Sequence, residues 1–135
     1  MQGKLTELFL PGLLLSACLT AQAGTAAAGE EAQLPHAFAA GWEGQETCEV
    51  LFEDDAMRVA RCIFPPGIGH EKHYHNPHFG YVLEGGTLQI TDGKGERTVT
   101  TRAGASWSTN TRTVHEAVNI GDTTTSYLIM EPISD

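Results

Sequence analysis

Four of the six histidines of the chain fall within residues 65–86, in the segment PPGIGHEKHYHNPHFGYVLEGG. His73 and His75 flank a single residue there, and successive side chains of an extended strand point to opposite faces. Both imidazoles therefore lie on one face of the strand expected here. Two nitrogen donors side by side supply half of a metal site, and this requirement limits how the rest of the chain can be arranged.

A turn follows this pair directly. Asn76-Pro77 marks it, because proline fixes its own backbone angle and disfavours helix at the residue before it. His78 then opens a returning apolar strand over 79–83, which ends at the turn 84–86. A third ligand can thus lie across the hairpin from the first two. His115 lies far downstream, so a site that includes it requires the chain to fold back on itself.

Two interpretations of the histidines compete. They can coat a polar loop, or they can hold a metal ion, and a His-x-His pair on a predicted strand with further histidines nearby favours the metal. Imidazole binds Fe, Mn, Zn, Ni and Cu with overlapping affinities, so the pattern indicates a divalent transition metal without identifying the ion.

The remaining segments predict an all-β chain. Residues 47–64 form a hairpin around Asp55, and residues 87–91 and 97–101 form another. A final apolar strand covers 127–130. No segment has a helical period, and strands recur about every 8 to 12 residues with turns between them, as in a sandwich or barrel.

The first of these hairpins contains two cysteines. Cys48 and Cys62 are each seven residues from Asp55, so they lie opposite one another if the turn centres there. Directly opposed residues approach the separation that a disulfide requires. The alternatives are a cross-strand disulfide and two small buried thiols.

The length of the chain limits the number of domains, and its charge limits the kinds of binding partner. The 135 residues are enough for one domain, and 41% of them are apolar, which suffices for a core. The 17 acidic residues outnumber the 8 basic ones, so nucleic acid and anionic lipid headgroups are not expected partners.

The N-terminal residues resemble an export signal. Residues 1–23 carry Lys4, a short apolar run and then small residues, with cleavage expected after Ala23. Residues 15–18 also read as a lipoprotein box, in which case the signal is 1–17 and lipidated Cys18 tethers the protein to a membrane. The protein is then periplasmic or secreted, with or without the lipid anchor; a buried helix is the non-export alternative.

A flexible lead-in is expected over 24–45, followed by one folded domain over 46–135. The lead-in is rich in Ala, Gly and Glu and shows no period of 2 or 3.6. His36 lies within it and is expected to have no role at the metal.

Two motifs of the chain resemble those of the cupins. Gly67, His73-x-His75 and Gly85 match the first, G-x5-H-x-H-x(3,4)-E-x6-G. Gly104 through Asn119 resembles the second, G-x5-P-x-G-x2-H-x3-N, with His115 and Asn119 in register. The resemblance covers roughly residues 48 to 132, most of the chain after the signal.

Three positions depart from these motifs. His78 stands where cupins usually have glutamate, with one residue fewer after His75, while Asn110 and Arg112 replace the Pro and Gly of the second motif. The first departure implies four neutral ligands in place of three histidines and a carboxylate. Without a carboxylate ligand the metal ion keeps more of its positive charge. This would favour Lewis-acid behaviour over a strongly reducing iron centre.

The resemblance implies a double-stranded β-helix, the jelly-roll barrel of cupins, with a metal near one mouth held by His73, His75, His78 and His115. His70 is expected to be a solvated loop residue, ahead of a role as a supporting or substitute ligand. Substrate would enter at the mouth, which some of five apolar side chains would line: Phe64, Phe79, Tyr81, Trp107 and Met130.

Three classes of function fit such a protein. The first is a metal-dependent enzyme of dioxygenase, isomerase, decarboxylase or lyase type, acting on a small organic substrate. The others are a non-catalytic module that binds a small molecule or metal, and a structural or storage protein with a vestigial site. The catalytic residues are unknown; Tyr81 and Glu116 are weak candidates for an acid or base, with packing and solvation as their alternatives. A homodimer is expected, since cupins often pair.

Overall fold

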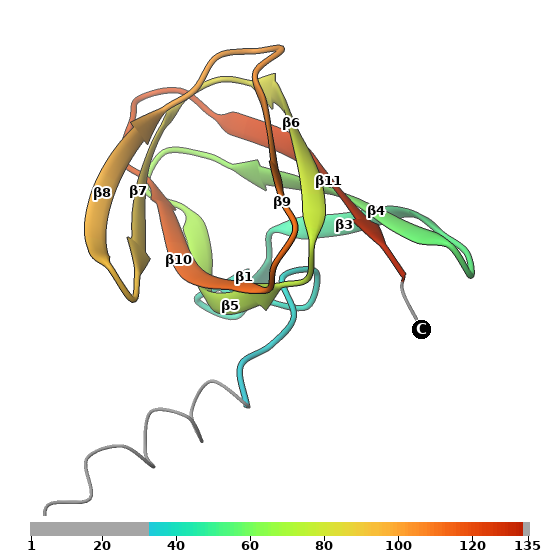
Figure 1. Ribbon diagram of the computed structural model, residues 1–135. Helices are drawn as coiled ribbons and strands as arrows, with labels where there is room; N and C mark the ends of the chain where they lie inside the picture. The colour runs from blue at the N-terminus through green and yellow to red at the C-terminus, as the bar shows by residue number, and fades with distance from the viewer. Residues whose placement is uncertain (1–32, 134–135) are drawn as a thin grey trace, which may run out of the picture.

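A computed structural model of the chain describes residues 33–133. The expected signal segment 1–23, Cys18 and the first part of the lead-in lie outside these residues. The described part is all-β, with its strands wrapped around a common interior (Figure 1). No helix within it is long and apolar enough to cross a membrane. The strands are β1 (Gly41–Trp42), β2 (Gln45–Glu46), β3 (Cys48–Glu53), β4 (Met57–Phe64), β5 (Gly69–His75), β6 (His78–Glu84), β7 (Thr87–Asp92), β8 (Gly95–Thr100), β9 (Ser106–Thr109), β10 (Thr113–Asn119) and β11 (Thr125–Pro132).

Two antiparallel sheets form the barrel. One has the strand order β5-β10-β7-β8 and the other β3-β4-β11-β6-β9, while β1 and β2 pair separately. From β5 onward the chain crosses repeatedly from one sheet to the other, so neighbours such as β5 and β10 are far apart in sequence (Figure 1). The expected double-stranded β-helix is confirmed.

Both expected hairpins are present, as β3–β4 and β7–β8. In the first, Cys48 lies directly opposite Cys62, and their sulfurs form a disulfide. The prediction that the two cysteines lie opposite one another, made from the position of the turn, is therefore confirmed. Cys62 is fully buried, so the disulfide connects the edge strand β3 to the interior of the barrel.

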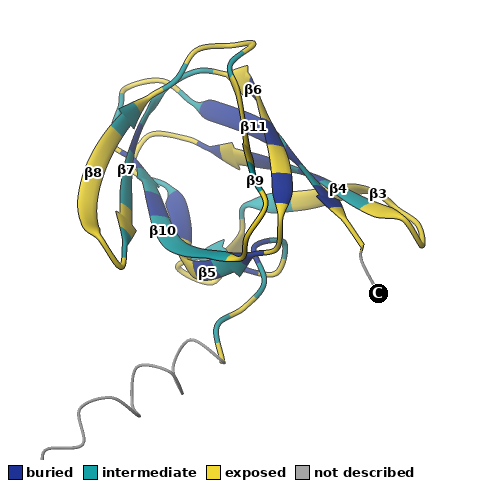
Figure 2. Cartoon of the chain, viewed as in Figure 1, coloured by how far each residue is buried: buried dark blue, intermediate teal, exposed yellow. Residues whose placement is uncertain are grey.

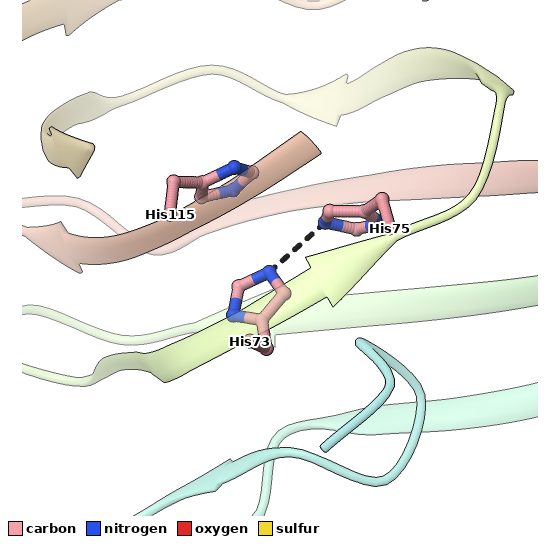
Figure 3. Close-up of side chains that lie close together, drawn as sticks. All are labelled: His73, His75 and His115. Atoms are coloured by element: carbon pink, nitrogen blue, oxygen red, sulfur yellow. Dashed lines mark hydrogen bonds between the residues drawn. The ribbon is translucent and has the colours of Figure 1, made fainter. Parts of the chain in front are cut away.

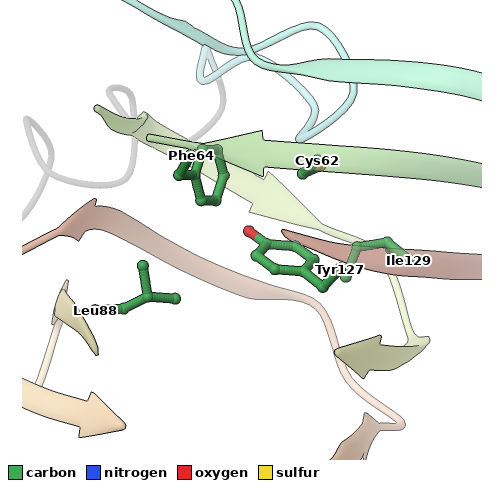
Figure 4. Close-up of a cluster of buried hydrophobic side chains, with 5 residues drawn as sticks. All are labelled: Cys62, Phe64, Leu88, Tyr127 and Ile129. Atoms are coloured by element: carbon green, nitrogen blue, oxygen red, sulfur yellow. The ribbon is translucent and has the colours of Figure 1, made fainter. Parts of the chain in front are cut away.

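The core lies between the sheets, where inward-facing side chains of β4, β7 and β11 meet (Figure 4). Its buried members are Cys62, Phe64, Leu88, Tyr127 and Ile129. Buried and less buried residues alternate along the second half of β4 and of β11, whereas β8 is exposed along nearly its whole length (Figure 2). The alternation is the pattern expected of strands with one face toward a core.

The expectation that His70 is solvated is wrong, because the side chain is fully buried. A β-bulge in β5 explains this. His73 pairs with His115 and His70 with Ala117, so three steps on β5 match two on β10. The extra residue resets the alternation and turns His70 and His73 to the same inner face.

Part of the expected flexible lead-in is ordered. His36 forms a parallel bridge with Tyr74, and the Ala37 N–H donates to the Tyr74 carbonyl at 2.8 Å. Ala37 is fully buried, and the Trp42 ring packs against Gly69 of β5. Residues 33–45 therefore cover β5, and the folded unit begins before residue 46.

Candidate metal centre

Three imidazoles meet on the inner face of the four-stranded sheet. His73 and His75 come from β5, and the pairing of β5 with β10 places His115 opposite His73 (Figure 3). The ring centroids of His73 and His115 are 4.7 Å apart, and those of His75 and His115 are 5.2 Å apart. One nitrogen of each ring lies within 4.8 Å of the other two. These are three of the four expected ligands.

The hydrogen bonds of His73 define its tautomer. Its Nδ1 lies 2.6 Å from the Glu71 carbonyl oxygen, and a carbonyl can only accept, so the proton is on Nδ1. The Nε2 of the neutral ring then presents a lone pair. That lone pair faces His75 Nε2, 3.0 Å away (Figure 3).

The interior keeps these imidazoles neutral. Burial, reinforced by the neighbouring histidines, lowers the pKa of His115 to about 3 and lowers that of His73 still further. Burial also lowers the pKa of His75, although the neighbouring Glu131 carboxylate partly opposes the shift. Neutral imidazole is the form that binds metal. Three neutral nitrogen donors at this spacing, two of them buried and the third, on His115, partly buried, fit a divalent transition metal.

His78 lies beside the three imidazoles without joining their group. Its ring centroid is 4.6 Å from that of His75. Nδ1 donates to the Asn76 carbonyl at 2.8 Å, and Nε2 accepts from Trp107 Nε1 at 3.2 Å. The fourth expected ligand therefore has the right tautomer, but its lone pair is shared with an indole N–H.

A buried carboxylate stands next to His75, where the sequence predicted histidines alone. Glu131 of β11 is 3% exposed, and its Oε1 lies 3.5 Å from His75 Nδ1. Burial alone would raise the pKa of this carboxyl, but the hydrogen bond from His36 and the adjacent His75 ring bring it down to about 2. Alternation along β11 was the available signal, since Tyr127, Ile129 and Glu131 share the inner face.

His70 packs against His73 of the three-histidine group. Its ring lies 3.9 Å from that of His73 and 5.5 Å from that of Phe64. Nε2 is 3.7 Å from Cys48 Sγ of the disulfide. Burial lowers the pKa of His70 to about 4, so this ring is also neutral, and it packs between the disulfide and His73.

A cavity of about 240 Å³ opens beside the cluster. Its walls are mainly apolar, and Arg97 is the one Lys or Arg side chain among the described residues that line it. The lining comprises His75, His78, Val82, Leu88, Ile90, Arg97, Val99, Thr101, Trp107, His115, Ala117, Tyr127 and Ile129.

Of the five apolar residues expected at the mouth, only Trp107 lines this cavity. Phe79 and Tyr81 are exposed, because His78 and Gly80 occupy the inner face of β6. Phe64 belongs to the core, and Met130 alternates with the inward residues of β11. The two acid or base candidates, Tyr81 and Glu116, do not line the cavity either, whereas Tyr127 does.

Comparison with known proteins agrees with this geometry. The family described as Cupin domain, Cupin_2, matches residues 60–131. A cupin domain from Bordetella pertussis Tohama I has a TM-score of 0.61 and 22% identity, covering 64% of this chain and 92% of that one.

Two further solved structures share the fold. The polyketide cyclase RemF from Streptomyces resistomycificus has a TM-score of 0.56 and 18% identity, covering 77% of each chain. A predicted oxalate decarboxylase from Thermotoga maritima has a TM-score of 0.51 and 19% identity, covering 76% of this chain and 96% of that one. No curated protein matches the sequence. Identities this low show the fold alone.

The lowered histidine pKa values predict how stability depends on pH. Below the ordinary pKa of 6.5, the unfolded chain binds protons that His70 and His115 do not bind in the folded protein. The free energy of unfolding of metal-free protein should therefore fall as pH drops from 6.5 toward 4. Each such histidine contributes up to about 1.4 kcal/mol per pH unit.

Urea unfolding of the metal-free protein at several pH values measures this dependence. His115→Gln is the matched control, because glutamine does not titrate, and its slope should be smaller by up to about 1.4 kcal/mol per pH unit. A free energy of unfolding that stays constant between about pH 7 and pH 5 would contradict the prediction.

Proposed function

The chain belongs to the Cupin_2 family of cupin domains, and we propose that it binds a divalent transition metal through His73, His75 and His115 and acts on a small organic substrate. One observation carries this proposal. His73 and His75 are buried and His115 is partly buried, all three are held neutral, and the Nε2 atoms of His73 and His75 face each other at 3.0 Å. Burying three polar rings without a shared partner would cost stability.

His78 is the proposed fourth ligand. The Asn76 carbonyl already holds its proton on Nδ1, so Nε2 is the nitrogen that can bind a metal. Nε2 accepts a hydrogen bond from the Trp107 indole, so His78 must give up that hydrogen bond in order to bind a metal. Trp107 is held in place because it packs directly on Gly80, where an added Cβ would lie 2.2 Å from the indole.

The cavity indicates the class of substrate. Apolar walls and a volume of about 240 Å³ suit a small, largely apolar molecule. Arg97 lies at one wall, paired with Asp92, and its guanidinium can bind an anionic oxygen. We therefore propose a small organic anion, positioned with its charged end at Arg97 and its reacting end toward the histidines.

The residues around the cavity have distinct proposed roles in a reaction of dioxygenase, isomerase or lyase type. A bound metal ion supplies Lewis-acid polarisation of a substrate oxygen. The apolar side chains and Trp107 exclude water from the histidines. Burial raises the pKa of Tyr127, so its hydroxyl stays protonated and can donate a hydrogen bond to the substrate.

We also propose that the protein is exported. The Cys48–Cys62 disulfide supports this, because disulfides persist mainly in oxidising compartments. The N-terminal residue of protein recovered from the cell envelope or medium should be Gly24, or an acylated Cys18 if the lipoprotein signal is used. Recovery with residues 1–17 still attached would contradict export through either signal.

The metal proposal predicts the metal content of the protein. Elemental analysis of protein purified without a polyhistidine tag should find one equivalent of a transition metal, and His75→Ala should abolish it. Glu49→Ala is the control: it removes an exposed carboxylate that pairs with Arg61 and lies outside the three-histidine group, and it should keep the metal. Equal metal content in all three proteins would overturn the assignment.

Metal-loaded protein can then be incubated with small diketones, flavonols or sugar derivatives, with and without dioxygen. Product that forms with the wild type and not with His75→Ala supports an enzyme. Saturable binding of the same compounds without turnover supports the alternative, a non-catalytic binding module.

The hydrogen bond between His78 and Trp107 predicts that a variant without the indole N–H binds metal more tightly. Trp107→Phe removes the indole N–H and frees Nε2 of His78, so metal affinity should rise by the value of one hydrogen bond, about 1 kcal/mol or about fivefold. Competition against a chelator measures the change. The double variant Trp107→Phe/His78→Gln should lose the gain, and an equal gain in both variants would exclude His78 as a ligand.

A further inference from the structure

Two buried polar atoms at the edge of the cluster face one another. They are His75 Nδ1 and Glu131 Oε1, 3.5 Å apart. Within residues 33–133 neither has a conventional hydrogen-bond partner, although both residues are almost completely buried. Leaving such atoms unpaired costs about 1–3 kcal/mol each, so their approach to each other needs an explanation.

The other oxygen of the carboxylate is held by the N-terminal segment. His36 Nε2 lies 2.7 Å from Glu131 Oε2. The backbone N–H of Phe38 donates to His36 Nδ1 at 3.1 Å, so the proton of neutral His36 is on Nε2 and is donated to the carboxylate. The orientation of Glu131 is therefore set from outside the barrel strands.

His36 itself has little freedom. The Tyr74 N–H donates to the Pro35 carbonyl at 3.1 Å, and the Ala37 N–H donates to the Tyr74 carbonyl at 2.8 Å. Its ring also meets those of Phe38 and Tyr74 edge to face, with centroids 4.8 Å and 5.2 Å away. A segment outside the family match at 60–131 thus holds a carboxylate next to a metal ligand.

This chain of contacts determines where His75 carries its proton. A carboxylate oxygen accepts, so the stable arrangement places the N–H on Nδ1, toward Glu131. The lone pair of His75 is then on Nε2, where it faces the lone pair of His73 at 3.0 Å. The opposite tautomer would donate from His75 Nε2 to His73 Nε2 at 3.0 Å, but it would set the Nδ1 lone pair against the carboxylate, and a charged oxygen is the stronger acceptor.

We propose that Glu131, held by His36, is a positioning residue that keeps His75 in its Nδ1–H tautomer and directs Nε2 to the metal. This inference rests on the proposed metal site and adds the groups that orient one of its ligands. Carboxylates behind metal-bound histidines typically account for about 10- to 100-fold in metal affinity.

A second cation held by His75, His78 and Glu131 is the competing interpretation, since their ligand atoms lie within 4.8 Å of one another. Both nitrogens of His78 already have partners, the Asn76 carbonyl and the Trp107 indole. Binding through His75 Nδ1 would also remove the proton that Glu131 accepts. The geometry therefore favours a hydrogen bond over a second ion.

The direct test is the tautomer of His75 in metal-free protein, measured from long-range proton–nitrogen NMR correlations of the imidazole. The wild type should show His75 protonated on Nδ1. In Glu131→Ala the proton should move to Nε2, because His73 Nε2 is then the nearest acceptor. Glu131→Gln has one acceptor oxygen for two donors: with that oxygen accepting from His36, its amide N–H faces His75 Nδ1, so the proton should move to Nε2 in this variant as well.

Metal affinity provides the second readout, with Co²⁺ as the probe and a competing chelator. Glu131→Ala should bind one equivalent about 10- to 100-fold more weakly. His36→Ala should weaken binding in the same direction, and His36→Gln should restore part of it, since glutamine can still donate to Glu131. Glu49→Ala, which removes an exposed carboxylate paired with Arg61, should have no effect.

Three results would overturn the proposal. They are an Nε2–H tautomer of His75 in the wild type, unchanged Co²⁺ affinity in Glu131→Ala, and a second equivalent of Co²⁺ that Glu131→Ala removes. Failure of the metal site itself is distinguishable. Wild-type protein that binds no Co²⁺ would refute the proposed function, while the tautomer would still test the role of Glu131.

Discussion

The pairing of β5 with β10 is the constraint on which the candidate site depends. It sets His115 opposite His73 and so joins a His-x-His strand to a histidine some forty residues away in the sequence. The bulge in the same pairing turns His70 inward and shifts the neighbouring side chains. A slip of one residue in this register would move the ligands to the outer face.

Placing several imidazoles in the interior is costly for the fold. Each displaces an apolar side chain, and each is kept neutral by burial rather than by a charged partner. The apolar core lies to one side of them, around Phe64, Tyr127 and Ile129, and the disulfide at Cys62 reinforces it. The site is thus supported on one side by dense packing and open on the other to the cavity.

The functional unit extends beyond the strands of the barrel. Residues 33–45 pack along β5, and His36 reaches the carboxylate of Glu131. The orientation proposed for His75 therefore depends on a side-chain contact between the first and last described segments. Backbone hydrogen bonds of Pro35 and Ala37 with Tyr74 fix the position of His36 in that contact.

The sequence by itself determined what depends on neighbouring residues. Alternation and turn residues predicted the strands, the hairpins, the face shared by His73 and His75, and the opposition of Cys48 and Cys62, because a strand repeats every two residues. Only the tertiary structure decided the bulge that buries His70 and the roles of Glu131 and His36. Those features follow from pairing between segments distant in the chain, and local patterns carry no record of register across such distances.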